Sequence, residues 1–120
     1  MRRLIFLFLL AVCQPFMAHA QTYSFNGVKS DIVIDVRTPE EFSAGHINGA
    51  INIPYDRIEA NRSLLDKIKK DDNVLVYCRS GRRSEIAKQT LNNLGYKNVQ
   101  NGGGMDSLTA KLKTCTGATC

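Results

Sequence analysis

The sequence predicts a single α/β domain built on a central parallel sheet with helices on both faces. Short apolar runs of strand length alternate along the chain with stretches whose apolar residues recur at helical spacing. Strands that alternate with helices pair in parallel, because each helix carries the chain back to the edge where the previous strand began. The 120 residues suffice for one such domain, and no internal repeat or low-complexity segment divides them.

The first central strand and the first helix are predicted next to each other. Residues 32–36 form an apolar run broken by one acid, which is typical of a strand buried on both faces. Thr38 is expected to cap the following helix, with Pro39 at its first position and Glu41 as the return partner of a capping box. Gly45 is expected to end this helix, since glycine suits a helix C-terminus.

The alternation continues toward the middle of the chain. Residues 50–53 predict a second strand, which Pro54 ends. Residues 56–69 have a helical pattern in which an interruption near Asn61 is allowed. A turn then leads into the apolar run 74–77, which predicts the strand that delivers Cys78.

The last third of the chain predicts two helices around one strand. One helical face carries a set of mainly apolar residues: Ile86, Ala87, Thr90, Leu91 and Leu94. Gly95 is expected to end that helix. Residues 96–100 predict a short strand, residues 102–104 a flexible glycine turn, and residues 105–113 a last helix.

Cys78 is the candidate nucleophile. It ends the strand 74–77 and opens a cationic loop before a helix: Arg79, Ser80, Gly81, Arg82, Arg83 and Ser84. Inward-pointing loop amides and the positive end of the helix dipole make a nest for an anion. Because three arginines add to this field, the thiol is expected to ionise near neutral pH. The alternative is a small buried hydrophobe, which would need no cationic loop beside it.

The N-terminus predicts a secretory signal peptide cleaved after residue 20. Arg2 and Arg3 give a basic start, residues 4–13 are apolar, and Ala18 and Ala20 are the small residues of a cleavage site. The apolar run is too short to span a membrane.

The mature chain is therefore expected to be residues 21–120, exported to a bacterial periplasm. A lipoprotein site at Cys13 is a less favoured alternative, because Val12 is bulkier than such a site usually tolerates. Cleavage lowers the formal net charge from +5 to +3. So small an excess gives no argument for nucleic-acid or membrane binding, whereas its clustering beside Cys78 suits a small anion.

Three cysteines remain in the mature chain, so at least one thiol is free or intermolecular in an oxidising compartment. Cys115 and Cys120 lie in a flexible tail, residues 114–120, that can close a small disulfide and leave Cys78 free. In a rival interpretation one tail cysteine is a resolving partner for Cys78. No metal site is predicted, because His46 is the only histidine of the mature chain.

Three segments resemble the rhodanese family of sulfurtransferases, and most closely its single-domain periplasmic members of the phage-shock type. They are Asp-Val-Arg-Thr-Pro-Glu-Glu-Phe at 35–42, Gly-His-Ile-Asn-Gly-Ala-Ile-Asn-Ile-Pro at 45–54 and Cys-Arg-Ser-Gly-Arg-Arg-Ser at 78–84. The likeness extends over about 25–113 and implies one rhodanese domain. Many members have a tryptophan where this chain has Leu108.

The resemblance implies a thiosulfate sulfurtransferase. The Cys78 thiolate would take the outer sulfur of thiosulfate, become a persulfide, and pass that sulfur to a thiophilic acceptor such as cyanide or a thiol. No cofactor is implied, and a monomer is expected. Arg79 and Arg82 are the candidates for gathering the substrate, and Gly81 allows the tight turn. Arg83 could instead face inward and hold the loop to an acid.

Other motif residues are expected to have structural roles. Asp35 and Arg37 are expected to form a buried or half-buried pair that fixes the geometry of the loop. His46 is expected in a packed turn, since an ionised thiol needs no general base. Glu40 and Glu41 are interpreted as helix-start charges.

Alternative functions are weighed against the same residues. Related phosphatases use a Cys-x5-Arg loop, whereas Arg83 gives Cys-x4-Arg here, a smaller ring that favours a sulfane sulfur over a phosphoryl group. A non-enzymatic persulfide carrier would use Cys78 without rapid thiosulfate turnover. A thiol–disulfide redox protein would pair Cys78 with Cys115 or Cys120.

Overall fold

The computed structural model describes residues 22–115, and for residues 113–115 it describes the backbone only. The predicted signal peptide and Cys120 lie outside the described residues. Four strands form a parallel sheet in the order β4 (Ile51–Asn52), β3 (Ile32–Asp35), β5 (Asn73–Cys78) and β6 (Asn98–Gly104). This is the central parallel sheet that the alternating pattern predicts.

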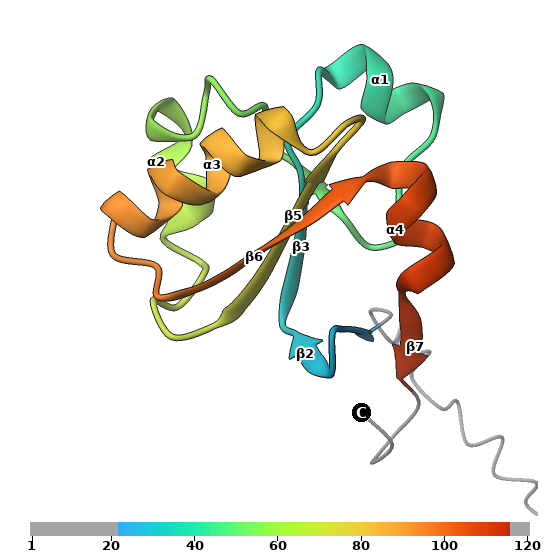
Figure 1. The fold of residues 1–120 in the computed structure, drawn as a ribbon. Helices are drawn as coiled ribbons and strands as arrows, with labels where there is room; N and C mark the ends of the chain where they lie inside the picture. The colour runs from blue at the N-terminus through green and yellow to red at the C-terminus, as the bar shows by residue number, and fades with distance from the viewer. Residues whose placement is uncertain (1–21, 116–120) are drawn as a thin grey trace, which may run out of the picture.

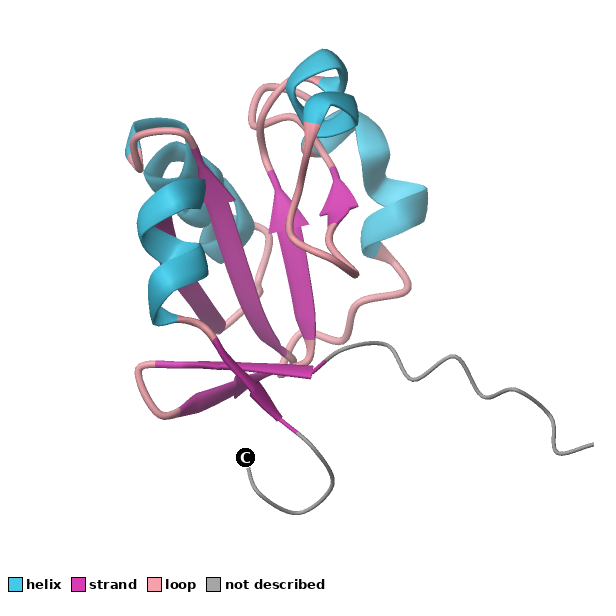
Figure 2. Cartoon of the chain, turned by 90° about the vertical axis from the view of Figure 1, so that its right-hand side faces the viewer, coloured by secondary structure: helices cyan, strands magenta, loops and turns pink. Residues whose placement is uncertain are grey.

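Helices cover both faces of this sheet (Figures 1 and 2). One face packs against α2 (Arg62–Leu65) and α3 (Arg82–Asn93). The other packs against α1 (Pro39–Ala44) and α4 (Met105–Lys111). Alternate residues of β5 point to opposite faces, as in any strand. Val74, Val76 and Cys78 join the first core, and Leu75 and Tyr77 join the second.

The start of α1 follows the prediction closely. Thr38 caps the helix, its hydroxyl accepts from the Glu41 N–H, and the Glu41 carboxylate accepts from the Thr38 N–H. Pro39 is the first helical residue, and Gly45 is the cap at the other end. This capping box fixes where α1 begins, which places Glu41 beside the loop that follows β5.

The helical pattern predicted over residues 56–69 is confirmed in its interruption near Asn61 and wrong in its extent. A 3₁₀ turn (Glu59–Asn61) precedes the short α2, and Asn61, the last residue of the turn and the N-cap of α2, has non-helical backbone angles. Beyond α2, Ile68 donates to the carbonyl of Leu65, three residues back, so the chain continues as turns. On α3, Ala87 and Leu91 are buried as expected. Ile86 is 38% exposed, because it lies outside the helical face that carries these two buried residues.

The predicted glycine turn at residues 102–104 is also wrong, since these glycines belong to β6. Gly104 pairs with Cys78 across the sheet, next to an irregularity in the register. A Cβ at Gly102 would come within 2.9 Å of Leu108, which has 0% exposure in the second core. Gly102 is required here because the strand packs closely against Leu108. The turn propensity of glycine had instead predicted that the strand would end before residue 102.

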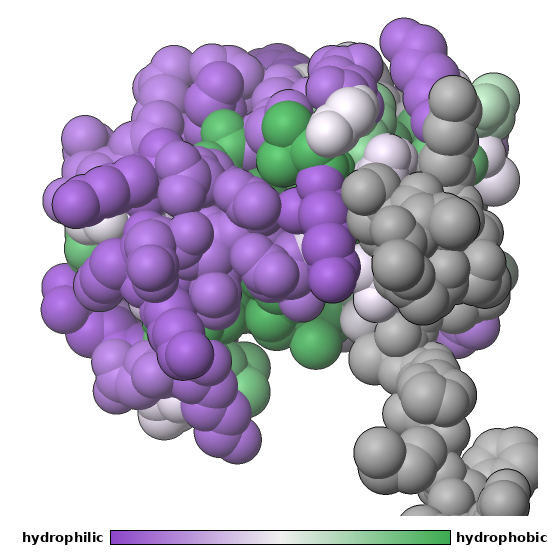
Figure 3. Space-filling view, turned by 90° about the horizontal axis from the view of Figure 1, so that it is seen from below, coloured by the Kyte–Doolittle hydropathy of each residue, from purple (hydrophilic) through white to green (hydrophobic). Residues whose placement is uncertain are grey.

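A second, antiparallel sheet lies at the end of the domain away from the Cys78 loop (Figure 1). It consists of β1 (Thr22–Phe25) between β2 (Val28–Ser30) and β7 (Lys113–Cys115). The last helix therefore ends at Lys111, and the expected flexible tail begins as a strand whose residue 115 pairs with Thr22. Seen from this end, the surface is mostly hydrophilic, with small apolar areas between polar side chains (Figure 3).

Candidate active site

Cys78 is the last residue of β5, and its side chain has 0% exposure. It lies at the carboxyl end of a central strand, where parallel sheets place their ligand sites. The N–H of Gly81 donates to the Cys78 sulfur at 2.9 Å, and the Ser84 hydroxyl lies 3.3 Å from the same atom. Gly81 has a φ of 91°, a left-handed conformation that favours glycine. The loop thus turns its amides onto the sulfur, as the sequence predicts.

The thiol of Cys78 is more acidic than an ordinary cysteine. Burial works against ionisation, but hydrogen bonds from the Ser84 hydroxyl and from the backbone N–H groups of Ser84, Ser80 and Gly81 outweigh it and lower the pKa of Cys78. The direction agrees with the sequence prediction, and the hydrogen bonds from the loop, of which the backbone amides were predicted, are its main causes. The loop can therefore stabilise a negative sulfur at this position.

Residues of the neighbouring strand β6 pack against the loop and form hydrogen bonds with it. A Cβ at Gly104 would collide with the carbonyl oxygen of Arg79, so only glycine allows the two backbones to approach this closely. Asn101, also on β6, donates to the carbonyl of Gly81 at 3.1 Å and accepts from the Ser84 hydroxyl at 2.6 Å. The sequence pattern did not predict Asn101 at the site, and it placed Ser84 in the loop without predicting its contact with the sulfur.

Asp35 and Arg37 form the buried pair that the sequence predicts. The guanidinium of Arg37 donates to both carboxylate oxygens of Asp35 at 2.7–3.1 Å, and it also donates to the carbonyl of Gly45. The hydroxyl of Tyr77, next to Cys78 in sequence, donates to Asp35 at 2.9 Å and accepts from the N–H of Ile47. Burial, the largest cause, raises the pKa of Tyr77, which keeps it neutral. The network ties the end of β5 to β3.

Arg83 pairs with Glu41 across the loop. Its two terminal nitrogens lie 2.7 and 3.0 Å from the two carboxylate oxygens, in the bidentate geometry that suits arginine. The Arg83 hydrogen bond is the largest cause that lowers the pKa of Glu41 to about 2. Arg83 thus holds the loop to an acid, the second of the two roles considered for it, and Glu41 does more than start α1.

Replacing Glu41 by glutamine is expected to reduce the free energy of unfolding by about 1 kcal/mol at neutral pH, because the pair is only partly shielded from water. A pKa lowered in the folded state stabilises the protein above the unfolded pKa, and this contribution is lost as the pH falls toward about 2. Urea unfolding at several pH values measures it. The two proteins should converge in acid. A constant difference from neutral pH down to acid would contradict this role for the carboxylate.

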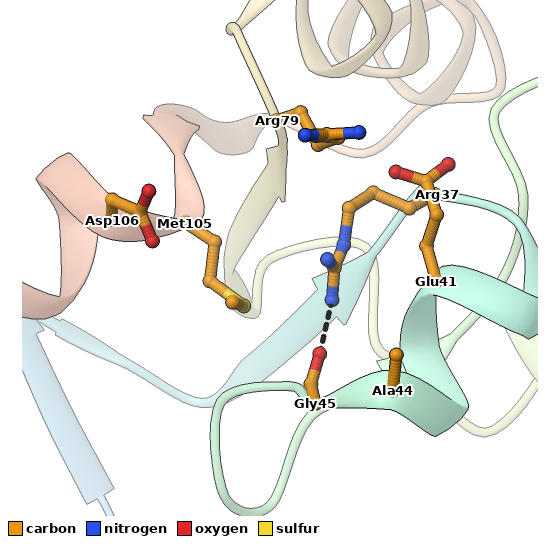
Figure 4. Close-up of a pocket in the computed structure, with 7 residues that line it drawn as sticks. All are labelled: Arg37, Glu41, Ala44, Gly45, Arg79, Met105 and Asp106. Atoms are coloured by element: carbon orange, nitrogen blue, oxygen red, sulfur yellow. Dashed lines mark hydrogen bonds between the residues drawn. The ribbon is translucent and has the colours of Figure 1, made fainter.

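A cleft of about 290 Å³ opens beside the loop (Figure 4). It is lined by residues in and on either side of α1, from the loop and from the start of α4: Arg37, Glu41, Ala44, Gly45, Arg79, Met105 and Asp106. Arg37 and Glu41 are already engaged by Asp35 and Arg83. Within residues 22–115, Arg79 is therefore the lining cation without an acidic partner, and it is exposed. Arg82 is exposed too, at the first turn of α3.

The remaining expectations concern His46, metals and membranes. His46 is exposed, its ring stacks on Phe42 and its Nδ1 contacts the Phe42 carbonyl, which matches a packed turn. Over the described part of the chain, no group of histidine, cysteine, aspartate and glutamate side chains is arranged to hold a metal ion. Among those same residues, no helix has the length and apolar character needed to cross a membrane.

Fold and site together define an α/β protein that presents a cysteine sulfur to the amides of a short loop at the end of a central strand. The model of the rhodanese-like domain matches residues 20–111, and the chain belongs to this family. The thiosulfate sulfurtransferase PspE of Escherichia coli K12 is 38% identical over 92 residues, which cover 77% of this chain and 88% of that protein.

One further relative is similar in sequence and two solved structures are similar in fold. A Schizosaccharomyces pombe protein provisionally named a mitochondrial thiosulfate sulfurtransferase is 46% identical over 85 residues, 62% of this chain but only 60% of that protein. The solved structure of an E. coli rhodanese with anions is 42% identical, with a TM-score of 0.58 over 63% of this chain and 88% of that one. The human single-domain sulfurtransferase TSTD1 is 33% identical, with a TM-score of 0.58 over 67% and 81%.

Proposed function

We propose that this protein is a thiosulfate sulfurtransferase that works through a persulfide on Cys78. The observation that carries the proposal is the hydrogen bonding of the buried Cys78 sulfur to the loop around Gly81. Such a loop stabilises negative sulfur, both in the attacking thiolate and in the terminal atom of a persulfide. The names of the E. coli and human relatives support the sulfurtransferase class.

The reaction balances without a cofactor. The Cys78 thiolate attacks the outer sulfur of thiosulfate, a sulfur–sulfur bond forms, and sulfite leaves with the electron pair of the broken bond. The persulfide then carries one negative charge, and a thiophilic acceptor attacks its terminal sulfur and releases the thiolate. Because Cys78 has 0% exposure, the groups that bury its sulfur must move before a donor reaches it. Steady-state kinetics with thiosulfate and cyanide should give the parallel lines of a ping-pong mechanism, and converging lines would contradict a free persulfide intermediate.

Arg79→Ala and Arg82→Ala are each expected to raise the thiosulfate KM by about 5- to 150-fold, the effect of losing one charge-assisted contact of roughly 1–3 kcal/mol. Both arginines are exposed at the loop and free to meet a dianion. Initial rates at varied thiosulfate measure the effect. Lys88→Ala is the matched control. It removes a cation from α3, the helix that begins with Arg82, at a position farther from the loop. Unchanged thiosulfate kinetics in both arginine variants would remove them from the binding role.

A persulfide carrier remains the second candidate, because the same loop would protect a stored persulfide. Slow thiosulfate turnover combined with rapid transfer of the Cys78 sulfur to a protein thiol would favour it. The redox alternative is weaker for Cys115, whereas Cys120 lies outside the described residues. The backbone of residue 115 lies in β7, at the opposite end of the domain from Cys78 (Figure 1), so a bridge between the two needs a large rearrangement.

The expected processing completes the proposal. Cleavage after Ala20 would export residues 21–120 to a periplasm, and a Cys115–Cys120 disulfide would leave Cys78 as the one free thiol there. Both inferences rest on the sequence of the ends alone. Peptide mass mapping of the secreted, oxidised protein tests them together: a new N-terminus at Gln21 and a tail disulfide support them, and a Cys78–tail bridge would contradict them.

A further inference from the structure

The hydroxyl of Ser84 faces more acceptors than it can serve. Ser84 is completely buried, and its oxygen lies 3.3 Å from the Cys78 sulfur, 3.0 Å from the Gly81 carbonyl and 2.6 Å from the side-chain oxygen of Asn101. A serine hydroxyl carries one proton. The Ser84 hydroxyl can therefore donate to a Cys78 thiolate only when it does not donate to the Gly81 carbonyl or to the Asn101 oxygen.

Asn101 is the strongest competitor, because its orientation is fixed. Its oxygen also accepts from the N–H of Gly103 at 2.9 Å, and its nitrogen donates to the Gly81 carbonyl and to the Glu85 carboxylate at 3.0–3.1 Å. A flipped amide would leave all of these groups facing the wrong partner. Two oxygens 2.6 Å apart repel unless a proton lies between them, so Ser84 must supply it.

We propose that Asn101 is a positioning residue that competes with Cys78 for the single proton of Ser84 and thereby sets the basicity of the nucleophile. A protonated Cys78 can donate to the Ser84 oxygen while Ser84 donates to Asn101, so every group is satisfied. Ionisation of Cys78 turns the Ser84 proton toward sulfur at the cost of the Asn101 contact. The competition therefore opposes the acidity that the loop amides create.

This role deepens the proposed function and rests on Cys78 being its nucleophile. A thiolate loses nucleophilicity as its pKa falls, so a restraint on acidity keeps the sulfur reactive. In the persulfide the Cys78 sulfur carries no formal charge, and Ser84 can return its proton to Asn101. When the acceptor removes the outer sulfur, the proton of Ser84 becomes available to the departing thiolate.

Charged groups from several elements lie around this network, and none of them is substituted in the variants below. They come from the loop, from α3, from α1 and α4, and from the neighbourhood of β3: Arg79, Arg82, Arg83, Glu85, Glu41, Asp106, Asp35 and Arg37. The Arg83 charge acts on Cys78 directly. The substitutions at residues 84 and 101 change which atom accepts the Ser84 hydroxyl proton, and they remove none of these charges.

The test is the pH dependence of Cys78 alkylation by iodoacetamide, read on the Cys78 peptide by mass spectrometry. Asn101→Ala is expected to lower the apparent pKa of Cys78 by about one unit, the effect of one more hydrogen bond to an anion, because the Gly81 carbonyl still accepts from the N–H of Glu85 after it loses Asn101. Asn101→Asp is expected to raise it, since a carboxylate is a stronger acceptor and adds negative charge. Asn98→Ala, at the exposed far end of β6, is the matched control and should leave the titration unchanged.

The Ser84→Ala background separates competition for the proton from simple support of the loop. There, adding Asn101→Ala is expected to leave the pKa of Cys78 unchanged, because no hydroxyl remains to compete for. An equal fall with and without Ser84, or no fall in Asn101→Ala, would overturn the proposal. The titration requires no thiosulfate. If the unaltered protein transfers no sulfur, the proposed function is contradicted. The effect of Asn101 on the pKa of Cys78 can still be measured in that case.

Discussion

Replacing Cys78 by serine is expected to reduce sulfur transfer from thiosulfate to cyanide to the background of the assay while the protein stays folded. A serine hydroxyl is not ionised near neutral pH and cannot form a persulfide. The hydroxyl is smaller than the thiol, so the buried position should accept it. Thiocyanate formation measures the activity, and circular dichroism with urea unfolding measures the fold.

Cys115→Ser is the matched control for this prediction. It removes a cysteine from β7, in the other sheet, and in a reducing buffer it should leave the transfer rate unchanged. If the Cys78 variant keeps most of the activity, the persulfide account is wrong. If both cysteine variants lose activity together, the redox interpretation of Cys78 with the tail gains the support it now lacks.

Asp35→Asn is expected to destabilise the protein by about 3–5 kcal/mol, the cost of leaving a buried guanidinium without its counter-charge. Asp35 has 0% and Arg37 only 5% exposure. The same change weakens the acceptor for the Tyr77 hydroxyl, next to the nucleophile. Urea unfolding at neutral pH measures the loss, and Asp66→Asn, at an exposed aspartate, gives the expected small effect of a surface substitution.

The double variant Asp35→Asn with Arg37→Gln tests the origin of that loss. Removing both charges should recover part of the stability, because no uncompensated charge then remains buried. A loss below about 1 kcal/mol in the single variant would contradict the role given to the pair, since that is the size expected of exposed ion pairs. So would purely additive effects of the two substitutions.

Short-range patterns predicted the parts of the fold that lie near in sequence. The capping box at Thr38 and Glu41 needs only four residues, and the apolar runs of β3 and β5 are buried on both faces of the central sheet. The Asp35–Arg37 pair spans two residues. Each of these is decided by neighbours along the chain, so the sequence carries the information locally.

Features decided by distant packing escaped prediction. Glycines 102–104 form strand because β6 runs close to Leu108 and to the Arg79 backbone. Nothing local marks Asn101 as a partner of Ser84, 17 residues away. The β1–β2 hairpin had a signal that was not used: Asn26 and Gly27 both have positive φ, the hairpin turn that an Asn-Gly pair favours.

The same distinction holds within the active site. The segment from Cys78 to Ser84 predicted an amide-lined loop, and the described structure has it. Which arginine would remain available to a substrate depended on Glu41, 42 residues before Arg83. A sequence pattern can show that three arginines lie near a cysteine. Only the position of α1 beside the loop shows that one of them, Arg83, is held by Glu41 and has a structural role.

The central claim is that Cys78 carries the transferred sulfur, and intact mass spectrometry tests it most directly. The mature protein is weighed before thiosulfate, after thiosulfate, and again after cyanide, with the modified peptide located by fragmentation. The account predicts a gain of one sulfur atom on Cys78 that cyanide removes. A reduced, free Cys78 that gains no sulfur from thiosulfate, or a sulfur gained elsewhere in the chain, would contradict it.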